Sequence, residues 1–175
     1  MRKISSEYLE LQRKLHANPN YGVASILIAP IVKEFFEAGK FVSISDYGAG
    51  KRNLYHTLTN LGLKKFKYYA YDPVFPDYGP PQSADLVCCI DVLEHIEEEF
   101  LDDVLKDLKM ITVKIGFFTI ATGPAKKKLE DGRNAHLIQK PSNWWLIKLC
   151  KHFEIEHLQK QPGGFLLVVK SKLFN

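Results

Sequence analysis

The segment Ser43-Ile44-Ser45-Asp46-Tyr47-Gly48-Ala49-Gly50 decides the fold that this sequence predicts. Apolar residues around Ile44 indicate a strand, the two glycines indicate a tight turn, and leucines at helical spacing indicate a helix that ends at Gly62. Such a turn leaves backbone N–H groups and a helix N-terminus facing the end of the strand. It can hold a nucleotide-like ligand, although many turns of this kind serve packing alone.

The residues on either side of the glycines separate the candidate ligands. Residues 51–53 contain no third glycine, which argues against a dinucleotide pyrophosphate and therefore against a nicotinamide-dependent dehydrogenase. Asp46, in front of the turn, repels a phosphate but attracts a positive amine or sulfonium group. Together with the segments described next, this acid-x-Gly-x-Gly pattern resembles motif I of the class I S-adenosylmethionine-dependent methyltransferases. The resemblance implies that the cofactor contacts Asp46, Tyr47, Gly48, Ala49 and Gly50.

A second acid stands at the end of the next predicted strand. Residues 66–72 indicate a strand that ends in Asp72, about 20 residues beyond the glycine turn, where a carboxylate can bind both hydroxyls of a ribose. We assign Asp72 and the following Pro73 to the cofactor; an aspartate before proline that only forms a turn is the alternative.

The third motif follows a continuous apolar run, residues 84–90, which is typical of a strand buried on both faces. The segment Asp91-Val92-Leu93-Glu94-His95-Ile96 is similar to the Asp-Val-Leu-Glu-His segment of many small-molecule and tRNA-modifying methyltransferases. The resemblance implies that these residues pass beneath the methionine part of the cofactor and line the methyl-transfer pocket. Asp91, Val92 and Leu93 are therefore predicted cofactor contacts. Glu97 to Glu99 are expected in the first turn of the next helix.

The N-terminal residues 1–39 are predicted to form a helical cap beside the ligand site. Helical spacing covers residues 5–17, and a second helix is expected from about Ser25 to Gly39. In the resembled family such segments often close over the cofactor or substrate, which makes Tyr21 a candidate cofactor contact. The alternative is a turn with an anchoring tyrosine.

The longest polar connection, residues 122–136, is predicted to recognise the substrate, because a long loop at the carboxyl side of a sheet is usually functional. It carries two candidate substrate contacts, Arg133 and Asn134, and Trp144 in the following helix is a third. His136 and His95 are the candidate catalytic bases, His136 being preferred. A solvent loop that caps its own backbone and a packed His95 are the alternatives.

The order of the elements predicts a single α/β domain over residues 1–175. We expect a Rossmann-like three-layer α/β/α sandwich over residues 40–175, with a mostly parallel sheet of about six strands. Segments 153–158 and 165–170 are expected to form a C-terminal antiparallel hairpin, and Ser142 to cap the last helix. The proline-rich residues 73–83 stand where the resembled family has a further helix and strand, so that edge strand is expected to be missing.

Composition narrows the classes of protein. The chain has 46% hydrophobic and 25% charged residues, and no apolar run approaches the roughly 20 residues that span a bilayer, so a soluble cytoplasmic protein without a membrane partner is expected. Cys88, Cys89 and Cys150 show no metal-ligand spacing, so reduced core thiols and no metal are expected. A net charge of +4 with short lysine clusters keeps a nucleic-acid partner possible but does not favour one.

The sequence thus predicts a compact S-adenosylmethionine-dependent methyltransferase. Its expected reaction is transfer of a methyl group to an oxygen or nitrogen of a small-molecule or sugar-containing acceptor. An RNA- or tRNA-modifying methyltransferase and a non-catalytic S-adenosylmethionine-binding module remain as alternatives. The Asp/Asn-Pro-Pro-aromatic and Pro-Cys segments of enzymes that methylate DNA bases are absent after residues 84–90.

Overall fold

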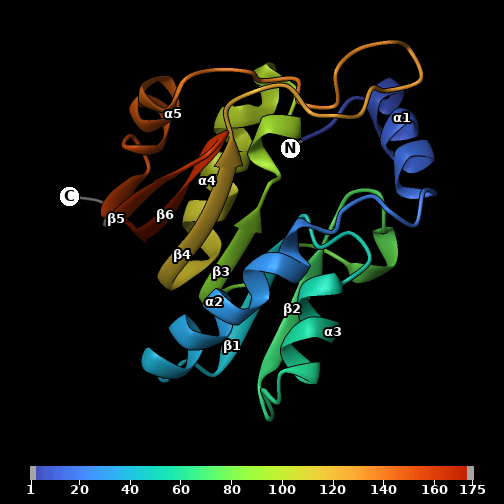
Figure 1. The fold of residues 1–175 in the computed structure, drawn as a ribbon. Coiled ribbons are helices and arrows are strands. Elements are labelled where there is room, and N and C mark those ends of the chain that lie inside the picture. Colours follow the sequence, from blue (N-terminus) through green and yellow to red (C-terminus); the bar gives the residue numbers. More distant parts are fainter. Residues whose placement is uncertain (1–2, 173–175) are drawn as a thin grey trace.

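The computed structural model describes residues 3–172, which form one six-stranded sheet in the order β2-β1-β3-β4-β6-β5 (Figure 1). The strands β1 (Ser43–Tyr47), β2 (Lys67–Tyr71), β3 (Ala84–Ile90) and β4 (Thr112–Ala121) pair in parallel. The strands β5 (Phe153–Gln161) and β6 (Gly164–Ser171) form an antiparallel hairpin, and β6 pairs antiparallel with β4. The predicted mostly parallel sheet with its C-terminal hairpin is confirmed.

Helices cover both faces of the sheet, as the three-layer prediction requires. The helices α2 (Ala24–Ala38) and α3 (Asn53–Asn60) share one apolar cluster with the sheet, while α4 (Leu101–Ile111) and α5 (Ser142–Leu149) share the other. Alternation along β3 supplies both clusters: Leu86 and Cys88 belong to the first, and Val87 and Cys89 to the second. The continuous apolar run of β3 is therefore buried on both faces.

The cap over the carboxyl ends of the strands is smaller than predicted. Helix α1 (Ser6–His16) lies there, held by the Tyr8 hydroxyl, which donates to the His95 carbonyl oxygen at 2.7 Å. An ion pair between Lys14 and Glu130 joins α1 to the loop after β4, which Figure 1 draws in orange running across to α1. Helix α2 instead packs beside α3 on one face of the sheet, because its apolar side chains are buried in the cluster there. Only its first residues line the cavity beneath the cap.

Several local predictions need correction. Glu97 precedes a short 3-10 turn, η3 (Glu98–Phe100), and α4 begins only at Leu101, so the three glutamates do not form its first turn. The Glu97 carboxylate instead accepts the Ser5 N–H at 2.7 Å. Ser142 is the first residue of α5 and gives no capping bond, because Pro141 occupies the cap position. Cys150 is exposed, whereas the other two cysteines are buried.

The segment between β2 and β3 contains only a 3-10 turn, η1 (Pro76–Tyr78), and β2 is the edge of the described sheet. The expected absence of a further strand in residues 73–83 agrees with this arrangement. No helix within residues 3–172 has the length and apolar character needed to cross a membrane.

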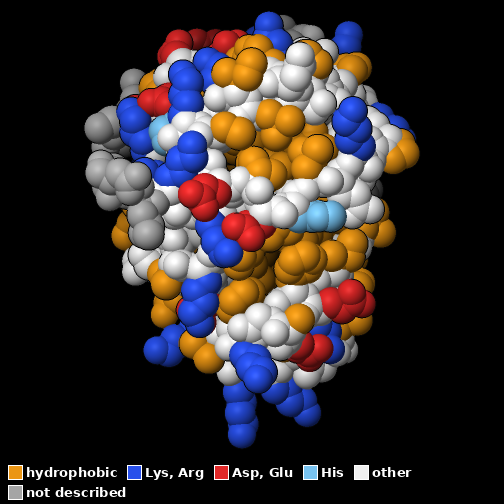
Figure 2. All heavy atoms as spheres, turned by 90° about the vertical axis from the view of Figure 1, so that its left-hand side faces the viewer, with side chains coloured by type: hydrophobic (Ala, Val, Ile, Leu, Met, Phe, Trp, Pro, Cys, Tyr) orange, Lys and Arg blue, Asp and Glu red, His pale blue; other side chains and the backbone are white. Residues whose placement is uncertain are grey.

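One face of the molecule combines apolar and basic side chains. Figure 2 shows hydrophobic side chains in two groups on this face, separated by a band that contains acidic and basic side chains and a histidine, with further lysine and arginine side chains scattered around the rim. A nucleic-acid footprint is instead a continuous basic patch or stripe. The arrangement on this face therefore differs from such a footprint.

The glycine turn after β1 has the backbone that the sequence predicts, with φ of 81° at Gly48 and 49° at Gly50. Gly48 also lies against the end of β3: a Cβ atom added there would stand 2.4 Å from Cγ2 of Val92. Glycine is therefore required at Gly48 both for its backbone conformation and for the contact with Val92.

This double requirement predicts the effect of Gly48→Ala. Gly62 has a similar φ of 87° but no atom within 4 Å of an added Cβ, so Gly62→Ala measures the backbone cost alone. We expect Gly62→Ala to lower the free energy of unfolding by about 1 kcal/mol and Gly48→Ala by about 2–4 kcal/mol in urea denaturation. Adding Val92→Ala should recover part of the Gly48→Ala loss. Equal losses for the two alanine variants would contradict the packing role of Gly48.

Candidate functional site

A cavity of about 520 Å³ opens at the carboxyl ends of the parallel strands, beneath α1 and beside the loop after β4. Its volume lies within the range of about 300–1,000 Å³ that is usual for sites of small ligands and cofactors. Most of the site residues predicted from the sequence line it: Tyr21, Asp46, Tyr47, Gly48, Ala49, Gly50, Asp72, Pro73, Asp91, Val92, His95 and His136. The structure therefore brings together the three motifs at the edge of the sheet where ligands of open α/β sheets bind.

Four predicted site residues lie outside this lining, each for a visible reason. Leu93 is fully buried in the core cluster, and Trp144 packs on the same cluster from α5. Arg133 is exposed and pairs with Asp131, with Nε 2.6 Å from the carboxylate. The Asn134 amide accepts the N–H groups of Ala125 and His136 and donates to the Ala125 carbonyl, so it shapes the loop that carries His136.

The backbone N–H groups of the glycine turn are used within the protein. Gly48 and Ala49 both donate to the Tyr71 carbonyl, at 2.8 and 2.9 Å, and Gly50 donates to Oδ2 of Asp72 at 2.9 Å. The expectation that these groups face the ligand is therefore wrong for this turn. Oδ1 of Asp72 accepts the Val74 N–H at 2.8 Å, so the carboxylate is fixed at both oxygens while each keeps a second lone pair for a ligand.

Asp46 lines the cavity and is almost completely buried, with 4% exposure. Its carboxylate accepts a short hydrogen bond from the Tyr68 hydroxyl. Burial, with a smaller contribution from the nearby Asp72 carboxyl, raises the pKa of Asp46 to about 7 despite that bond. A cation placed in the cavity would favour the ionised carboxylate and offset this cost.

Asp91, the first residue of the third motif, has a left-handed backbone with φ of 51°, which is costly for a residue with a side chain. Thr119 of β4 holds it in place: the Asp91 N–H donates to Oγ1 of Thr119 at 3.0 Å, and the Thr119 hydroxyl donates to Oδ1 of Asp91 at 2.6 Å. The bend at Asp91 turns the following Val92 toward Gly48 and places both residues on the cavity wall.

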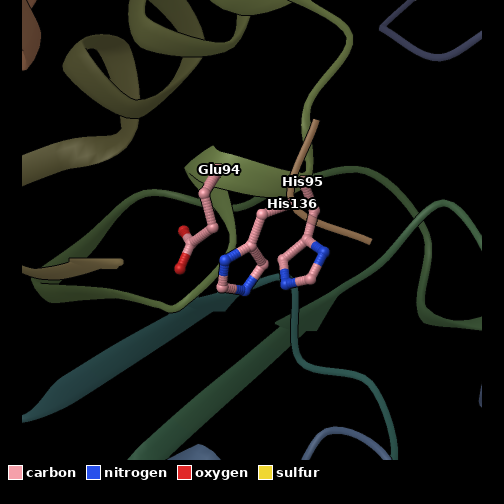
Figure 3. Close-up of side chains that lie close together, drawn as sticks. All are labelled: Glu94, His95 and His136. Atoms are coloured by element: carbon pink, nitrogen blue, oxygen red, sulfur yellow. The ribbon is translucent and has the colours of Figure 1, made fainter. Parts of the chain in front are cut away.

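Glu94, His95 and His136 gather beside the cavity, although His136 comes from a separate loop (Figure 3). Glu94 is fully buried, and burial, with a smaller contribution from Asp91, raises its pKa to about 8. Burial of the His95 imidazole lowers its pKa to about 4. The neighbouring His136 ring, with a centroid distance of 4.8 Å, contributes to this lowering. His95 is therefore a neutral imidazole at pH 7.

Comparisons with known proteins agree with this arrangement. No family model and no curated protein matches the sequence. Among solved structures, the mitomycin 7-O-methyltransferase MmcR aligns with a TM-score of 0.64 and 12% identity over 93% of this chain and 60% of its own. The 1,6-didemethyltoxoflavin-N1-methyltransferase of Burkholderia thailandensis, with S-adenosylhomocysteine bound, aligns with a TM-score of 0.62 and 15% identity over 98% and 92%. The DhpI complex with S-adenosylhomocysteine gives 0.57 and 14% over 96% and 98%.

The chain has the class I methyltransferase fold. At these identities the likeness concerns the fold alone, and the roles of single residues depend on the geometry described above. The order β2-β1-β3-β4-β6-β5 and the cavity at the carboxyl ends of β1, β2 and β3 are the features of that fold that position the site.

The sequence did not identify some lining residues of this methyltransferase fold. Tyr8, Gln12 and His16 of α1 all line the cavity, and the Gln12 amide donates to the Tyr8 hydroxyl at 2.5 Å. Their spacing indicated only a helix face, because a polar residue on that face could equally meet solvent. Glu94 stood within the third motif, and its burial beside two histidines was not visible from sequence spacing.

The raised pKa of Asp46 predicts a pH dependence of stability. The folded state binds the proton of the Asp46 carboxyl group more tightly than the unfolded chain does. The contribution of Asp46 to the free energy of unfolding is therefore lost as the pH rises between about 4 and 7. Asp46→Asn removes that loss. In urea denaturation, the free energy of unfolding of the variant relative to that of wild type should rise by about 1–3 kcal/mol when the pH is raised from 5 to 7.5. Asp77→Asn, at an exposed carboxyl group, is the matched control, and parallel pH curves for wild type and Asp46→Asn would contradict the prediction.

Proposed function

We propose that this chain is an S-adenosylmethionine-dependent methyltransferase that acts on an oxygen or nitrogen of a small-molecule or sugar-containing acceptor. One observation carries the proposal: a single cavity at the carboxyl ends of three parallel strands is lined by Asp46 and the glycine turn, by Asp72, and by His95 with His136. The solved structures with this fold that hold S-adenosylhomocysteine, among them DhpI and the toxoflavin methyltransferase, support the choice of cofactor.

The residues present fit this cofactor. Asp72 is fixed by the Gly50 and Val74 N–H groups, so its remaining lone pairs are oriented to accept both ribose hydroxyls. Asp46 is a buried carboxyl without a cationic partner among residues 3–172, which suits the ammonium group of the methionine part. Val74 lines the same cavity next to Asp72 and offers an apolar wall to the adenine.

The imidazoles of His95 and His136 are the proposed catalytic groups, and we call the part of the cavity that they line the acceptor end. When bound, the cofactor supplies an electrophilic methyl group on a sulfonium sulfur. An acceptor lone pair would form the new O–C or N–C bond to that methyl group, and the electron pair of the broken C–S bond would stay on sulfur. The acceptor proton passes to an imidazole nitrogen of His136 or His95, both of which line the cavity.

The protein otherwise has to align the acceptor and exclude water. Tyr21, His16 and His95 make edge-to-face contacts around the cavity, with centroids 4.9 Å apart for His16 and Tyr21 and 6.2 Å for Tyr21 and His95. The backbone around Tyr21 is tied to the start of α3, because Lys51 Nζ donates to the Asn18 carbonyl at 2.5 Å. Lys126 and Lys127 also line the cavity, which favours an acceptor that carries an anionic group.

Calorimetric binding of S-adenosylmethionine and S-adenosylhomocysteine tests the proposal. We expect micromolar binding, a free energy near about −8 kcal/mol, for the wild-type chain. Asp72→Asn keeps one oxygen acceptor for the turn and removes the charge, so it should weaken binding at least tenfold without unfolding the chain. Asp77→Asn is the control. Folded wild-type protein that binds neither ligand would contradict the proposed function.

A further inference from the structure

We propose that Glu94, His95 and His136 bind a divalent first-row transition metal ion beside the acceptor end of the cavity. One possible ligand atom of each residue lies within 4.8 Å of the others. Ligand atoms that share one tetrahedral ion at about 2.0–2.2 Å stand about 3.3–3.6 Å apart, so side-chain rotations that bring these atoms about 1–1.5 Å closer complete the site. Figure 3 shows the carboxylate and the two imidazole rings grouped together.

Hydrogen bonds prepare both imidazoles for this role. Nδ1 of His95 lies 2.7 Å from the Ala135 carbonyl oxygen, and Nδ1 of His136 lies 2.7 Å from the Gly123 carbonyl oxygen. A carbonyl oxygen only accepts, so in each ring Nδ1 carries the hydrogen and Nε2 keeps a free lone pair. Fixing the tautomer of a histidine through its second nitrogen is the usual support of a metal ligand in proteins.

One oxygen of the buried Glu94 carboxylate lacks a hydrogen-bond partner among residues 3–172. The residue has 0% exposure, and Oε1 accepts the Ala121 N–H at 2.9 Å, but Oε2 has no hydrogen-bond partner. No lysine or arginine among residues 3–172 forms an ion pair with it. A buried carboxyl oxygen without a partner is costly, and a metal ion bound by Glu94 and the two histidines would remove that cost.

The ligand set points to the class of ion. Two imidazoles and one carboxylate suit Zn²⁺, Fe²⁺, Co²⁺ or Mn²⁺ better than an ion that prefers only oxygen ligands. Three protein ligands leave coordination positions open for water or a substrate. Because His95 and His136 line the cavity, these open positions can face the acceptor.

The consequence for catalysis rests on the proposed function. An acceptor oxygen bound to the ion would lose its proton more easily, and that proton would pass to water at the mouth of the cavity. His95 and His136 would then act as metal ligands in place of their role as proton acceptors. A hydroxyl group of the acceptor, such as a sugar hydroxyl, can both bind the ion through its oxygen and lose its proton.

Titration of the protein with Co²⁺ alone, followed by its visible absorption, tests the site. We expect one Co²⁺ ion per chain, displaced by Zn²⁺, with at least tenfold weaker binding in Glu94→Gln and in His136→Ala. Glu94→Gln keeps the oxygen that accepts the Ala121 N–H, so it should remain folded. His157→Ala, at an exposed histidine on β5, is the control for adventitious binding and should leave the affinity unchanged.

Two results would overturn the metal site: no Co²⁺ binding by the folded wild-type chain, or equal binding by wild type and Glu94→Gln. The first result would favour a direct hydrogen bond from protonated Glu94 to an imidazole. The titration contains no S-adenosylmethionine, so its failure leaves the proposed cofactor binding standing. Loss of cofactor binding in calorimetry would likewise leave a positive Co²⁺ titration intact.

Discussion

The close contact between Val92 and Gly48 is the constraint on which the site depends. It joins the ends of β1 and β3, because an added Cβ at Gly48 would stand 2.4 Å from Val92. The Tyr71 carbonyl and the Asp72 carboxylate fix the same turn to the end of β2 by accepting its three N–H groups. Three parallel strands are thereby held in one register at their carboxyl ends. The positions of Asp46, Asp72 and the third motif follow from that arrangement.

The charge of the cavity gives the site its chemical preference. Burial raises the pKa values of Asp46, Asp72 and Glu94, which means that the ionised form of each carboxyl group is destabilised by its removal from water. Positive ligands offset this cost, and a phosphate would increase it. The proposed methionine ammonium at Asp46 and the proposed metal ion at Glu94 would therefore bind to groups that are destabilised when the cavity lacks a cation. Lys126 and Lys127, from the loop after β4, also line the cavity and suit an anionic part of the acceptor.

The sequence predicted the elements that depend on local pattern and missed those that depend on contacts between distant segments. The apolar run of β3, the glycine turn and the C-terminal hairpin were readily predicted because period and turn residues define them. Asn134 and Arg133 were expected to contact substrate, yet Asn134 bonds the backbone of its own loop and Arg133 pairs with Asp131. The grouping of Glu94 with His136 depends on how the loop after β4 folds back, which no sequence period encodes.

The most direct measurement for the central claim is a crystal structure of this chain with S-adenosylhomocysteine. We expect the ligand in the cavity at the carboxyl ends of β1, β2 and β3, with its ribose hydroxyls on Asp72 and its ammonium group near Asp46. The sulfur should face His95 and His136. A ligand bound elsewhere on the chain, or an Asp72 carboxylate that contacts only the Gly50 and Val74 N–H groups in the complex, would contradict it.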